Sequence, residues 1–339
     1  MLVQRGFSRP APADTALTIG NFDGVHLGHR ALLSRLGEVA QGRGLLPAAL
    51  TFEPHPREFF TPEAAPARLS TLREKLELLD ADGVRHCCVG RFNARFAALS
   101  AEQFIDDVLV RCLRVRHLII GDDFHFGAGR TGDFAQLRAA GERHGFAVES
   151  MRSVLLDGER ISSSAVRDAL AKGQLQHAER LLGRPYAIDG RIVRGQQLGR
   201  RLGFATANIR IRHDRPPLSG VFAVEVSGLS GLNGLDSRRD APPLAGIANL
   251  GVRPSIDANA RPLLEVHLFD FDRDIYGAHL SVRFLSKLRD EMSFPNLDAL
   301  RAQIARDAAI AHEFFAQRAT GGSNADARLL TSPFRPHPF

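Results

Sequence analysis

The sequence is poor in several residue types: among 339 residues it has no tryptophan, two tyrosines and three cysteines. Cys87, Cys88 and Cys112 lack the spacing of metal ligands, and the first two lie in an apolar run, so we interpret them as buried reduced thiols. No stretch approaches the roughly 18 consecutive apolar residues that a membrane-spanning helix needs. Residues 1–12 also lack the apolar core of a secretory signal. These absences favour a cytoplasmic protein without a membrane partner.

Blocks of like charge are absent as well, although the net charge is +6 and the isoelectric point about 9.9. The arginines are scattered along the chain, and no RNA-binding aromatic motif accompanies them. A modest basic excess suits phosphorylated small substrates equally well, so we expect no nucleic-acid partner. Hydrophobic residues at 44% and charged residues at 24% are typical of a globular protein, and the length predicts two domains. We expect a monomer or a weak homo-oligomer.

Residues 14–151 alternate between apolar strand candidates and short helical stretches. The expected strands are Ala16–Ile19, Leu46–Phe52, His86–Gly90, His117–Gly121 and Phe146–Ser150. The expected helices are Arg30–Gln41, Leu72–Asp80, Ala101–Leu113 and Phe134–His144. Strands that are apolar nearly throughout, with helices between them, predict a parallel sheet covered on both faces. The fold class is therefore α/β, Rossmann-like and doubly wound, with ligands at the carboxyl ends of the strands.

The pattern changes after two short helices expected at Ser163–Ala171 and Leu175–Leu182. Six strand candidates without intervening helices follow: Ala187–Arg194, Phe204–Ile211, Val221–Val226, Leu244–Leu250, Leu263–Phe269 and His279–Phe284. This pattern predicts a small six-stranded antiparallel β-barrel, followed by an amphipathic helix at Leu297–Gln317. We place the two domains at residues 1–183 and 184–318, and we expect a disordered tail at 319–339.

The stretch from Gly20 to His29 joins the first strand to the first helix, whose pattern begins at about His29. Its His-x-Gly-His spacing is weak alone, since one histidine could be an ordinary loop or capping residue. A helix N-terminus, however, offers unpaired backbone N–H groups and a positive dipole end to a phosphate. Gly28 leaves room for the phosphate, and the imidazoles of His26 and His29 can bind it. The candidate nucleotide-binding residues here are Gly20, Asn21, Phe22, Asp23, Gly24 and Gly28.

Three further stretches of the first domain follow strand ends or start a helix. Two prolines predict a rigid extended turn at residues 51–56, which alone would be a loop with a solvated histidine. Residues 121–133 offer carboxylates, aromatics and glycines, where an isoalloxazine ring could stack; otherwise they form a turn with capping aspartates. At residues 161–167, serine hydroxyls either cap a helix or, with an arginine, bind a triphosphate. The candidates from these stretches are Asp123, Phe124, Phe126, Ser163, Ser164 and Arg167.

The second domain carries a glycine-rich stretch and a carboxylate on a strand. Residues 195–208 begin as a loop able to approach phosphates and end in two hard oxygen donors on one side of an extended segment. The candidates in this stretch are Gly195, Gly199, Gly203, Thr206 and Asn208. As a bare pattern it is a hairpin turn with a polar face. In residues 264–268, strand alternation separates Glu265 from the apolar positions, although such a carboxylate is usually just solvated.

The motifs of both domains resemble, in order and spacing, those of the bacterial bifunctional riboflavin kinase/FMN adenylyltransferase family, also called FAD synthetases. The resemblance covers about residues 14–316. It implies that His26 and His29 stabilise charge on the α-phosphate of ATP while the phosphate of FMN attacks. The residues implied to hold the leaving β- and γ-phosphates are Ser163, Ser164 and Arg167, and those implied to line the flavin are Asp123, Phe124 and Phe126.

In the second domain the resemblance implies a riboflavin kinase, whose ATP is held by the glycine-rich stretch and by Mg²⁺ on Thr206 and Asn208. Glu265 would accept the proton of the riboflavin 5′-hydroxyl as this hydroxyl attacks the γ-phosphate. Arg289 and Phe294 would shape the flavin end. The expected cofactor is Mg²⁺ with ATP, and riboflavin, FMN and FAD are the expected substrates or products.

Two alternatives stay open. Ala205 stands where the family usually has proline; this loosens the backbone without removing a ligand, so we expect altered affinity and retained activity. The first alternative, motivated by Ala205, is that the kinase activity has been lost and the protein only adenylylates FMN. A flavin- or RNA-binding regulator is the second alternative, motivated by the net charge of +6.

Overall fold

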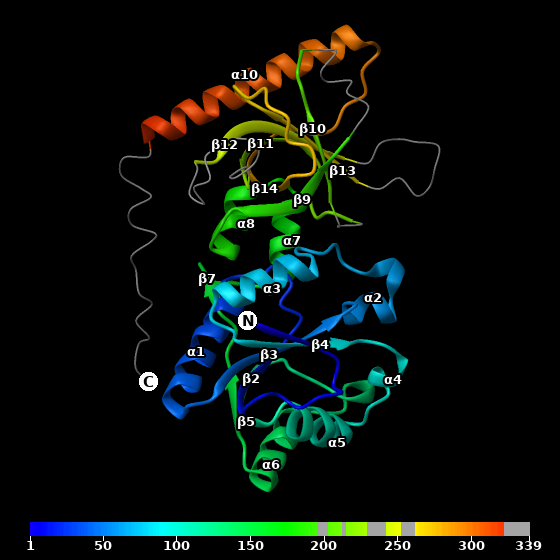
Figure 1. Cartoon of the computed structure of the whole chain (residues 1–339), viewed down its shortest axis with the longest axis vertical. Coiled ribbons are helices and arrows are strands. Elements are labelled where there is room, and N and C mark those ends of the chain that lie inside the picture. Colours follow the sequence, from blue (N-terminus) through cyan, green and yellow to red (C-terminus); the bar gives the residue numbers. More distant parts are fainter. Residues whose placement is uncertain (195–202, 212–214, 229–241, 252–261, 322–339) are drawn as a thin grey trace. The chain divides into compact units, whose positions relative to one another are not determined.

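The computed structural model describes residues 1–194, 203–211, 215–228, 242–251 and 262–321. They form two compact units, which we call the N-terminal unit and the barrel unit (Figure 1). The N-terminal unit comprises Met1–Leu170, His177–Arg184 and Arg215–Pro217. The barrel unit comprises Ala171–Gln176 and the described residues of Pro185–Asp214 and Leu218–Phe339.

The N-terminal unit contains a six-stranded sheet in which all paired neighbours are parallel. Its strands are β1 (Leu2–Arg5), β2 (Thr15–Ile19), β3 (Leu46–Glu53), β4 (His86–Arg91), β5 (Val115–Gly121) and β6 (Ala147–Met151), in the spatial order β1-β4-β3-β2-β5-β6. The central strand β2 is buried along its whole length, as expected where helices cover both faces of a parallel sheet. The predicted α/β architecture is confirmed.

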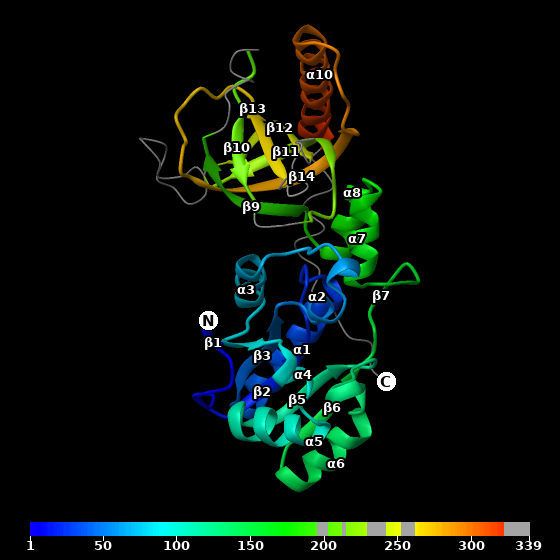
Figure 2. The ribbon, with the colours of Figure 1, turned by 90° about the vertical axis from the view of Figure 1, so that its right-hand side faces the viewer.

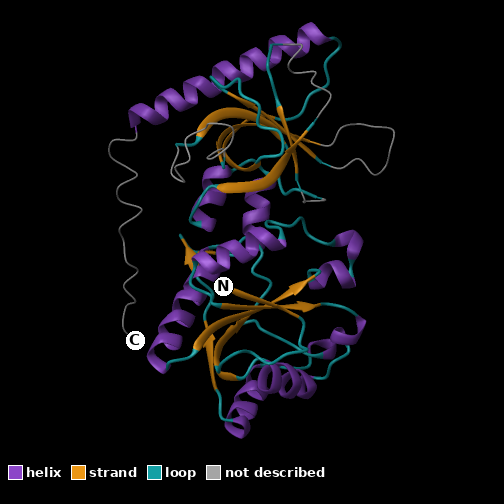
Figure 3. Ribbon diagram, in the orientation of Figure 1, coloured by secondary structure: helices purple, strands orange, loops and turns teal. Residues whose placement is uncertain are grey.

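Helices pack against both faces of this sheet (Figure 3). On one face lie α1 (Leu27–Arg43) and α3 (Leu72–Ala81). The other face carries α6 (Phe134–His144) and a helix in two parts, α5 (Ala101–Gln103) and the π-helix η2 (Phe104–Cys112). Each layer has its own apolar core, so the sheet edge formed by the strand ends remains available for a site.

Several short elements complete the N-terminal half of the chain. They are α2 (Pro56–Phe60), η1 (Pro62–Ala64), α4 (Ala94–Ala97), η3 (Ala128–Arg130), the antiparallel pair β7 (Leu155–Leu156) and β8 (Glu159–Arg160), α7 (Ser163–Ala171) and α8 (Leu175–Leu182). The sequence pattern did not predict β1, α2, α4 or the β7–β8 pair. β1 is mostly exposed at the edge of the sheet, so no apolar run marks it.

Two boundaries in this half differ from expectation. The helix expected from about His29 begins at Leu27. We expected an extended turn over residues 51–56. Instead β3 continues to Glu53, and the helix α2 already begins at Pro56. Proline suits the first turn of a helix because its missing N–H would have no partner there.

The barrel unit contains a closed barrel of antiparallel strands (Figure 2). The strands are β9 (Tyr186–Val193), β10 (Ala207–Arg210), β11 (Gly220–Ser227), β12 (Leu244–Gly251), β13 (Leu263–Leu268) and β14 (His279–Arg289), in the order β10-β13-β12-β11-β14-β9. The six-stranded antiparallel barrel predicted from the spacing of short strands is confirmed. β10 begins later than the expected Phe204, and β14 continues beyond the expected Phe284.

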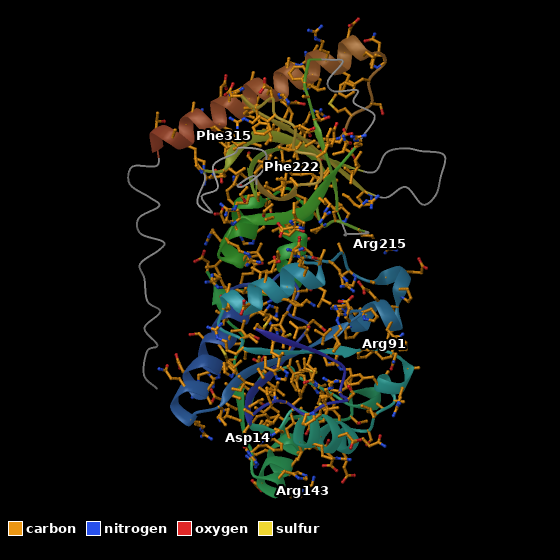
Figure 4. The ribbon with its side chains drawn as sticks, viewed as in Figure 1. Asp14, Arg91, Arg143, Arg215, Phe222 and Phe315 are labelled. Atoms are coloured by element: carbon orange, nitrogen blue, oxygen red, sulfur yellow. The ribbon has the colours of Figure 1, made fainter. Side chains whose placement is uncertain are left out.

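Alternation along β11 separates the inside of the barrel from the face that α10 (Leu297–Gly321) covers. The fully buried Phe222 packs edge-to-face on Phe284, with ring centroids 5.2 Å apart. The next residue, Ala223, packs instead with α10. Figure 4 labels Phe222 in the barrel and Phe315 on this helix.

The C-terminal helix α10 is longer than expected. It runs to Gly321, past Arg318, and Thr320 Oγ1 donates to the carbonyl oxygen of Ala316 (3.1 Å). The first residues assigned to a disordered tail are therefore helical, and residues 322–339 lie outside the described part of the chain.

Candidate active sites

The first site forms where the strand order of the N-terminal sheet reverses. β2 lies between β3 and β5, so the chain leaves β2 on one side and returns to it on the other. Ligands in open α/β sheets bind at such a point, outside the carboxyl ends of the strands. Residues 20–26, which we call the phosphate turn, follow β2, and residues 122–127 follow β5. The two longest candidate motifs of this unit thus lie at one edge of the sheet.

The phosphate turn has a strained backbone. Phe22, Gly24 and Val25 have positive φ angles of 48°, 80° and 38°. A β-branched residue such as Val25 rarely adopts this region, and such strain persists only where surrounding groups over-determine it. Here they do, because side chains donate to four carbonyls of the turn. These bonds run from Thr51 Oγ1 to Asn21 O (3.2 Å), from Ser163 Oγ to Asp23 O (2.8 Å), and from the Arg184 guanidinium to Gly24 O (2.6 Å) and Val25 O (2.9 Å).

Asp23 fixes the turn from within. Its buried carboxylate accepts the backbone N–H groups of Leu69 (3.1 Å) and Ser70 (3.0 Å) and pairs with the guanidinium of Arg167 (2.5 Å). Arg167 also donates to the carbonyl of Ala67 (2.6 Å). Asp23, predicted as an ATP-binding residue, therefore holds Arg167 in place at this edge of the sheet.

The other predicted residues of the turn differ in what they present. The Phe22 ring is fully buried and lies under Gly20, where an added Cβ would come within 3.2 Å of it. Only the backbone of Phe22 is left for a ligand, whereas Asn21 is exposed. A Cβ at Gly28 would approach the Nδ1 of His26 to 3.1 Å, so this glycine makes room for the imidazole.

His26 and His29 stack on each other, with ring centroids 3.7 Å apart. His26 caps α1: its Nδ1 accepts the N–H of His29 (3.3 Å), which leaves the proton of the neutral ring on Nε2. Burial lowers the pKa of His26 to about 4. Burial and the neighbouring His26 place the pKa of His29 well below its ordinary value, and its Nδ1 is enclosed without a hydrogen bond. Both rings are therefore neutral hydrogen-bond donors at neutral pH.

A third histidine lies nearby. His55 caps α2, its Nδ1 accepting the N–H of Arg57 (3.1 Å) while Glu58 accepts the N–H of His55 (3.1 Å). Burial lowers its pKa to about 4, and the charges of Asp23 and Lys75 also act on it. The simplest interpretation of the pattern was a solvated loop histidine, whereas in the structure His55 is a partly buried capping residue.

The three serines at the start of α7 have different partners. Ser162 caps the helix by accepting the N–H of Ala165 (3.1 Å). Ser163 donates to the phosphate turn, as described above, and Ser164 is exposed. Ser162 is therefore the capping residue, and Ser164 is the serine whose exposed hydroxyl a ligand could reach.

The residues after β5 combine an ion pair with stacked rings. Asp123 pairs with Arg160 of β8 (2.6 Å). Phe124 stacks on the buried Phe126, with centroids 5.8 Å apart. A chain of ring contacts continues from Phe126 through residues that sequence reasoning missed: Phe104, Phe96, Phe92, Phe59 and Phe60. They come from separate segments, and Phe60 at its end is 62% exposed.

The second site lies across five strands of the barrel. Register pairs Asn208 with Glu265, Glu265 with Asn249, Asn249 with Val221, and Val221 with Arg289. Directly paired residues in an antiparallel sheet lie on the same face, with Cβ atoms about 5 Å apart. Asn208 and Glu265, separate in sequence, are therefore neighbours, and Asn249 lies beside Glu265. Asn249 was not among the predicted site residues.

The end of this row is fixed by the C-terminal helix. The guanidinium of Arg289 pairs with the carboxylate of Asp307, which is 1% exposed, with its Nε 3.0 Å from Oδ2. The central carbon of the Arg289 guanidinium also lies 5.7 Å from the ring centroid of Phe294. Asp307 was not predicted. The sequence feature that could have revealed it is a carboxylate placed on the apolar stripe of the amphipathic helix.

The glycine-rich stretch of the second site is only partly described. Gly195 and Gly199 lie outside the described residues, whereas Gly203 has a φ of 88° and no atom near an added Cβ. Thr206 is half-buried and precedes β10, so strand alternation does not fix its side relative to Asn208. The Nδ1 of His267 donates to the carbonyl of Ala205 (2.8 Å). Among the described residues, no group of three or more His, Cys, Asp or Glu side chains is placed to hold a metal.

Comparisons with known proteins follow the division into two units. A family model described as FAD synthetase matches residues 8–165, and one described as riboflavin kinase matches residues 182–315. The chain is 52% identical over 299 residues to the bifunctional riboflavin kinase/FMN adenylyltransferase of Escherichia coli strain K12, covering 88% of this chain and 92% of that protein. The Haemophilus influenzae protein of the same name is 48% identical over 300 residues, 88% of this chain and 94% of its own.

A solved structure supports the fold. A crystal structure described as that of a macrolide-efflux protein from Streptococcus pneumoniae superposes with a TM-score of 0.75 at 25% identity, covering 91% of this chain and 97% of that one. Within the described residues of the present chain, no helix has the length and apolar character needed to cross a membrane.

Proposed function

The chain belongs to the bifunctional riboflavin kinase/FMN adenylyltransferase family, and from this membership and the two sites we propose which residues carry out each reaction. The enzyme phosphorylates riboflavin to FMN and adenylylates FMN to FAD. We assign the adenylyl transfer to residues 1–183 and the kinase reaction to residues 184–318, except that the boundary residue Arg184 belongs to the N-terminal unit and bonds to its phosphate turn. One observation carries the first assignment: Ser163 and Arg167 bond to Asp23, about 140 residues earlier, beside His26 and His29.

Adenylyl transfer needs no covalent nucleophile on the protein. An oxygen of the FMN phosphate forms a bond to the α-phosphorus of ATP, and the bond to the β-phosphate oxygen breaks as pyrophosphate leaves. The protein supplies positioning and charge stabilisation, worth roughly 7–11 and 3–4 kcal/mol in favourable cases. Since Nδ1 of His26 is an acceptor, its Nε2–H is the group that donates to the α-phosphate; His29 donates beside it.

The leaving pyrophosphate is assigned to the start of α7 and to Arg167. Ser163 has one hydroxyl hydrogen and gives it to Asp23 O, so we assign donation to the phosphates to the exposed Ser164. The exposed Asn21 and the backbone of Gly20 to Gly24 complete the ATP site. Asp123, Phe124 and Phe126 line the flavin side, where an isoalloxazine ring can stack on the exposed part of the phenylalanine chain.

In the kinase reaction Glu265 accepts the proton of the riboflavin 5′-hydroxyl as the hydroxyl oxygen attacks the γ-phosphorus and ADP leaves. Its position beside Asn208 in the barrel register supports this assignment. Mg²⁺ with ATP would be held by Thr206 and Asn208, and it would supply positive charge against the phosphates. A hydroxyl and an amide oxygen beside a carboxylate suit a cation that takes most of its ligands from phosphates and water. Arg289, oriented by Asp307, and Phe294 are assigned to the flavin end.

The remaining expectations stay proposals. The glycines at positions 195, 199 and 203 are assigned to the ATP of the kinase. A cytoplasmic location, a monomeric or weakly associated state, and no nucleic-acid partner are kept as predictions. Alanine in place of the usual proline at position 205 removes no side chain that would bind ATP or Mg²⁺, and the carbonyl of Ala205 still accepts a hydrogen bond from His267. We therefore keep the prediction that the kinase has an altered affinity for its substrates and retains its activity. An RNA-binding regulator is the alternative; filter binding at physiological salt that retains no RNA would end it.

The first experiment is a time course of the purified protein with riboflavin, ATP and Mg²⁺, with the flavins separated by HPLC. FMN rises first and FAD follows, because the product of the kinase is the substrate of the adenylyltransferase. Formation of FAD from added FMN, with none of either product from riboflavin, would overturn the kinase assignment and point to Ala205.

A further inference from the structure

Lys75 is a buried cation that the two reactions described so far leave unused. Only three of the 44 basic residues of the chain are lysines, and Lys75 is the one that belongs to the N-terminal unit. It lies on α3, just after the capping box formed by Thr71 and Glu74. The residue is 3% exposed, although lysines are almost never buried without a partner.

Its ammonium forms no hydrogen bond or ion pair with the residues that the structure describes. The nearby carboxylates are engaged elsewhere, since Asp23 pairs with Arg167 and Glu53 pairs with Arg68 (2.7 Å). In the described part of the chain, Lys75 Nζ is also not among the fully enclosed polar atoms that lack a hydrogen bond. The ammonium of Lys75 is therefore not fully enclosed, although the residue as a whole is 3% exposed.

The charge of Lys75 acts on groups around the phosphate turn. It lowers the pKa of His29 and of His55, and the charge of Asp23 raises the pKa of Lys75 in return. These groups come from the start of α1, the end of β3 and the turn between β2 and α1. The backbone also places Lys75 near the turn: Asp23 accepts the N–H groups of Leu69 and Ser70, and the N–H of Lys75 bonds to Thr71 O (2.9 Å), one helical turn further along α3. Burial, the largest effect, lowers the pKa of Lys75, so a bound anion would replace lost hydration.

We propose that Lys75 is a further catalytic residue of adenylyl transfer, whose ammonium contacts the non-bridging oxygens of the α-phosphate of ATP. The proposal rests on the function assigned to the phosphate turn. Lys75 exchanges no proton: the new bond joins an FMN phosphate oxygen to the α-phosphorus, and the electron pair of the broken bond leaves with pyrophosphate. The histidines beside it are neutral, Arg167 is paired with Asp23 and assigned to the leaving pyrophosphate, and Arg184 is bonded to backbone carbonyls of the turn. A lysine ammonium is a compact charge suited to phosphate.

The test compares Lys75→Met with Arg73→Met, which removes an exposed cation from the same helix. In Lys75→Met we expect kcat for FAD formation from FMN to fall at least about 100-fold, the typical effect of losing one charge-stabilising group. FMN formation from riboflavin stays unchanged and shows that the variant is folded. The melting temperature stays equal or rises, because an unpaired buried charge is removed. Arg73→Met changes neither reaction.

Retention of FAD formation within threefold of wild type in folded Lys75→Met would overturn the proposal. A lower melting temperature with unchanged kcat would do the same, since that result indicates a structural role. If the methionine variant does not fold, Lys75→Gln, which keeps a polar end without the charge, carries the same expectation. Wild-type protein that forms no FAD from FMN would instead refute the function assigned to the turn, which separates the two failures.

Discussion

The histidines beside the phosphate turn show how the surroundings of a side chain set its chemistry. His26 and His55 have pKa values lowered to about 4, mainly by burial, and burial also holds the pKa of His29 well below the ordinary value of about 6.5. Neutral rings cannot balance phosphate charge, so in the proposed site they would orient the phosphate by hydrogen bonds, while Lys75 and Arg167 would balance its charge. The family resemblance implied that these two histidines act on the α-phosphate, but it did not indicate their protonation state.

We predict that the free energy of unfolding falls as the pH is lowered from about 6.5 to about 4. In that window the histidines of the unfolded chain bind protons and those of the folded chain do not, so protonation favours the unfolded state. Above about pH 6.5 both states are neutral and the loss vanishes. Calorimetric melting of the protein at pH 7 and pH 5 measures the effect.

His55→Asn is the matched variant, because asparagine is a good N-cap and does not titrate. Near pH 7 the variant should have the melting temperature of wild type. Between pH 7 and pH 5 its melting temperature should fall by less than that of wild type. An equal loss in both proteins would show that His55 does not contribute.

Residue contacts across long sequence separations were the part that the sequence could not predict. Asp23 was assigned to ATP because it lies in a nucleotide-binding motif, yet its partners are Leu69, Ser70 and Arg167. Nothing local indicates which distant N–H groups will meet a carboxylate. Asp307 was missed for the same reason, since only the fold brings α10 to Arg289.

At the scale of elements, the strained turn between β2 and α1 depends on Arg184, which follows α8. Its guanidinium donates to the carbonyls of Gly24 and Val25. Arg184→Met should lower FAD formation from FMN on the order of 100-fold, because small misplacements of catalytic groups cost this much. FMN formation from riboflavin stays within threefold. HPLC of both reactions measures the outcome.

Arg180→Met is the control, since Arg180 is an exposed arginine on α8 that pairs with Asp157. It should leave both reactions unchanged. Wild-type FAD formation in Arg184→Met would mean that the turn keeps its conformation without these hydrogen bonds.

The sequence predicted those elements that bury a continuous apolar pattern. β2 to β6, the barrel strands and the long helices were found, with boundaries that shifted by a few residues. β1 and α2 were missed because β1 is mostly exposed at a sheet edge and α2 has no fully buried residue. Local pattern also cannot distinguish the π-helix η2 from the ordinary helix expected at residues 101–113.

The whole molecule combines a parallel sheet and an antiparallel barrel, and both could be predicted because each has its own periodicity and turn spacing. Which residues meet in each site depended on topology. The reversal of strand order at β2 brings the motifs after β2 and β5 to one sheet edge, and the barrel register brings Asn208 to Glu265. The two reactions are thus assigned to residue sets that share no member.

The measurement that tests this assignment most directly is HPLC of both half-reactions in His29→Ala and Glu265→Ala, beside the controls His144→Ala and Glu225→Ala. His29→Ala should form FMN from riboflavin at the wild-type rate but lose FAD formation from FMN by about 100-fold or more. Glu265→Ala should show the reverse, and the controls should change neither reaction. If either substitution abolished both reactions in a folded protein, the assignment of the two activities to separate sites would be wrong.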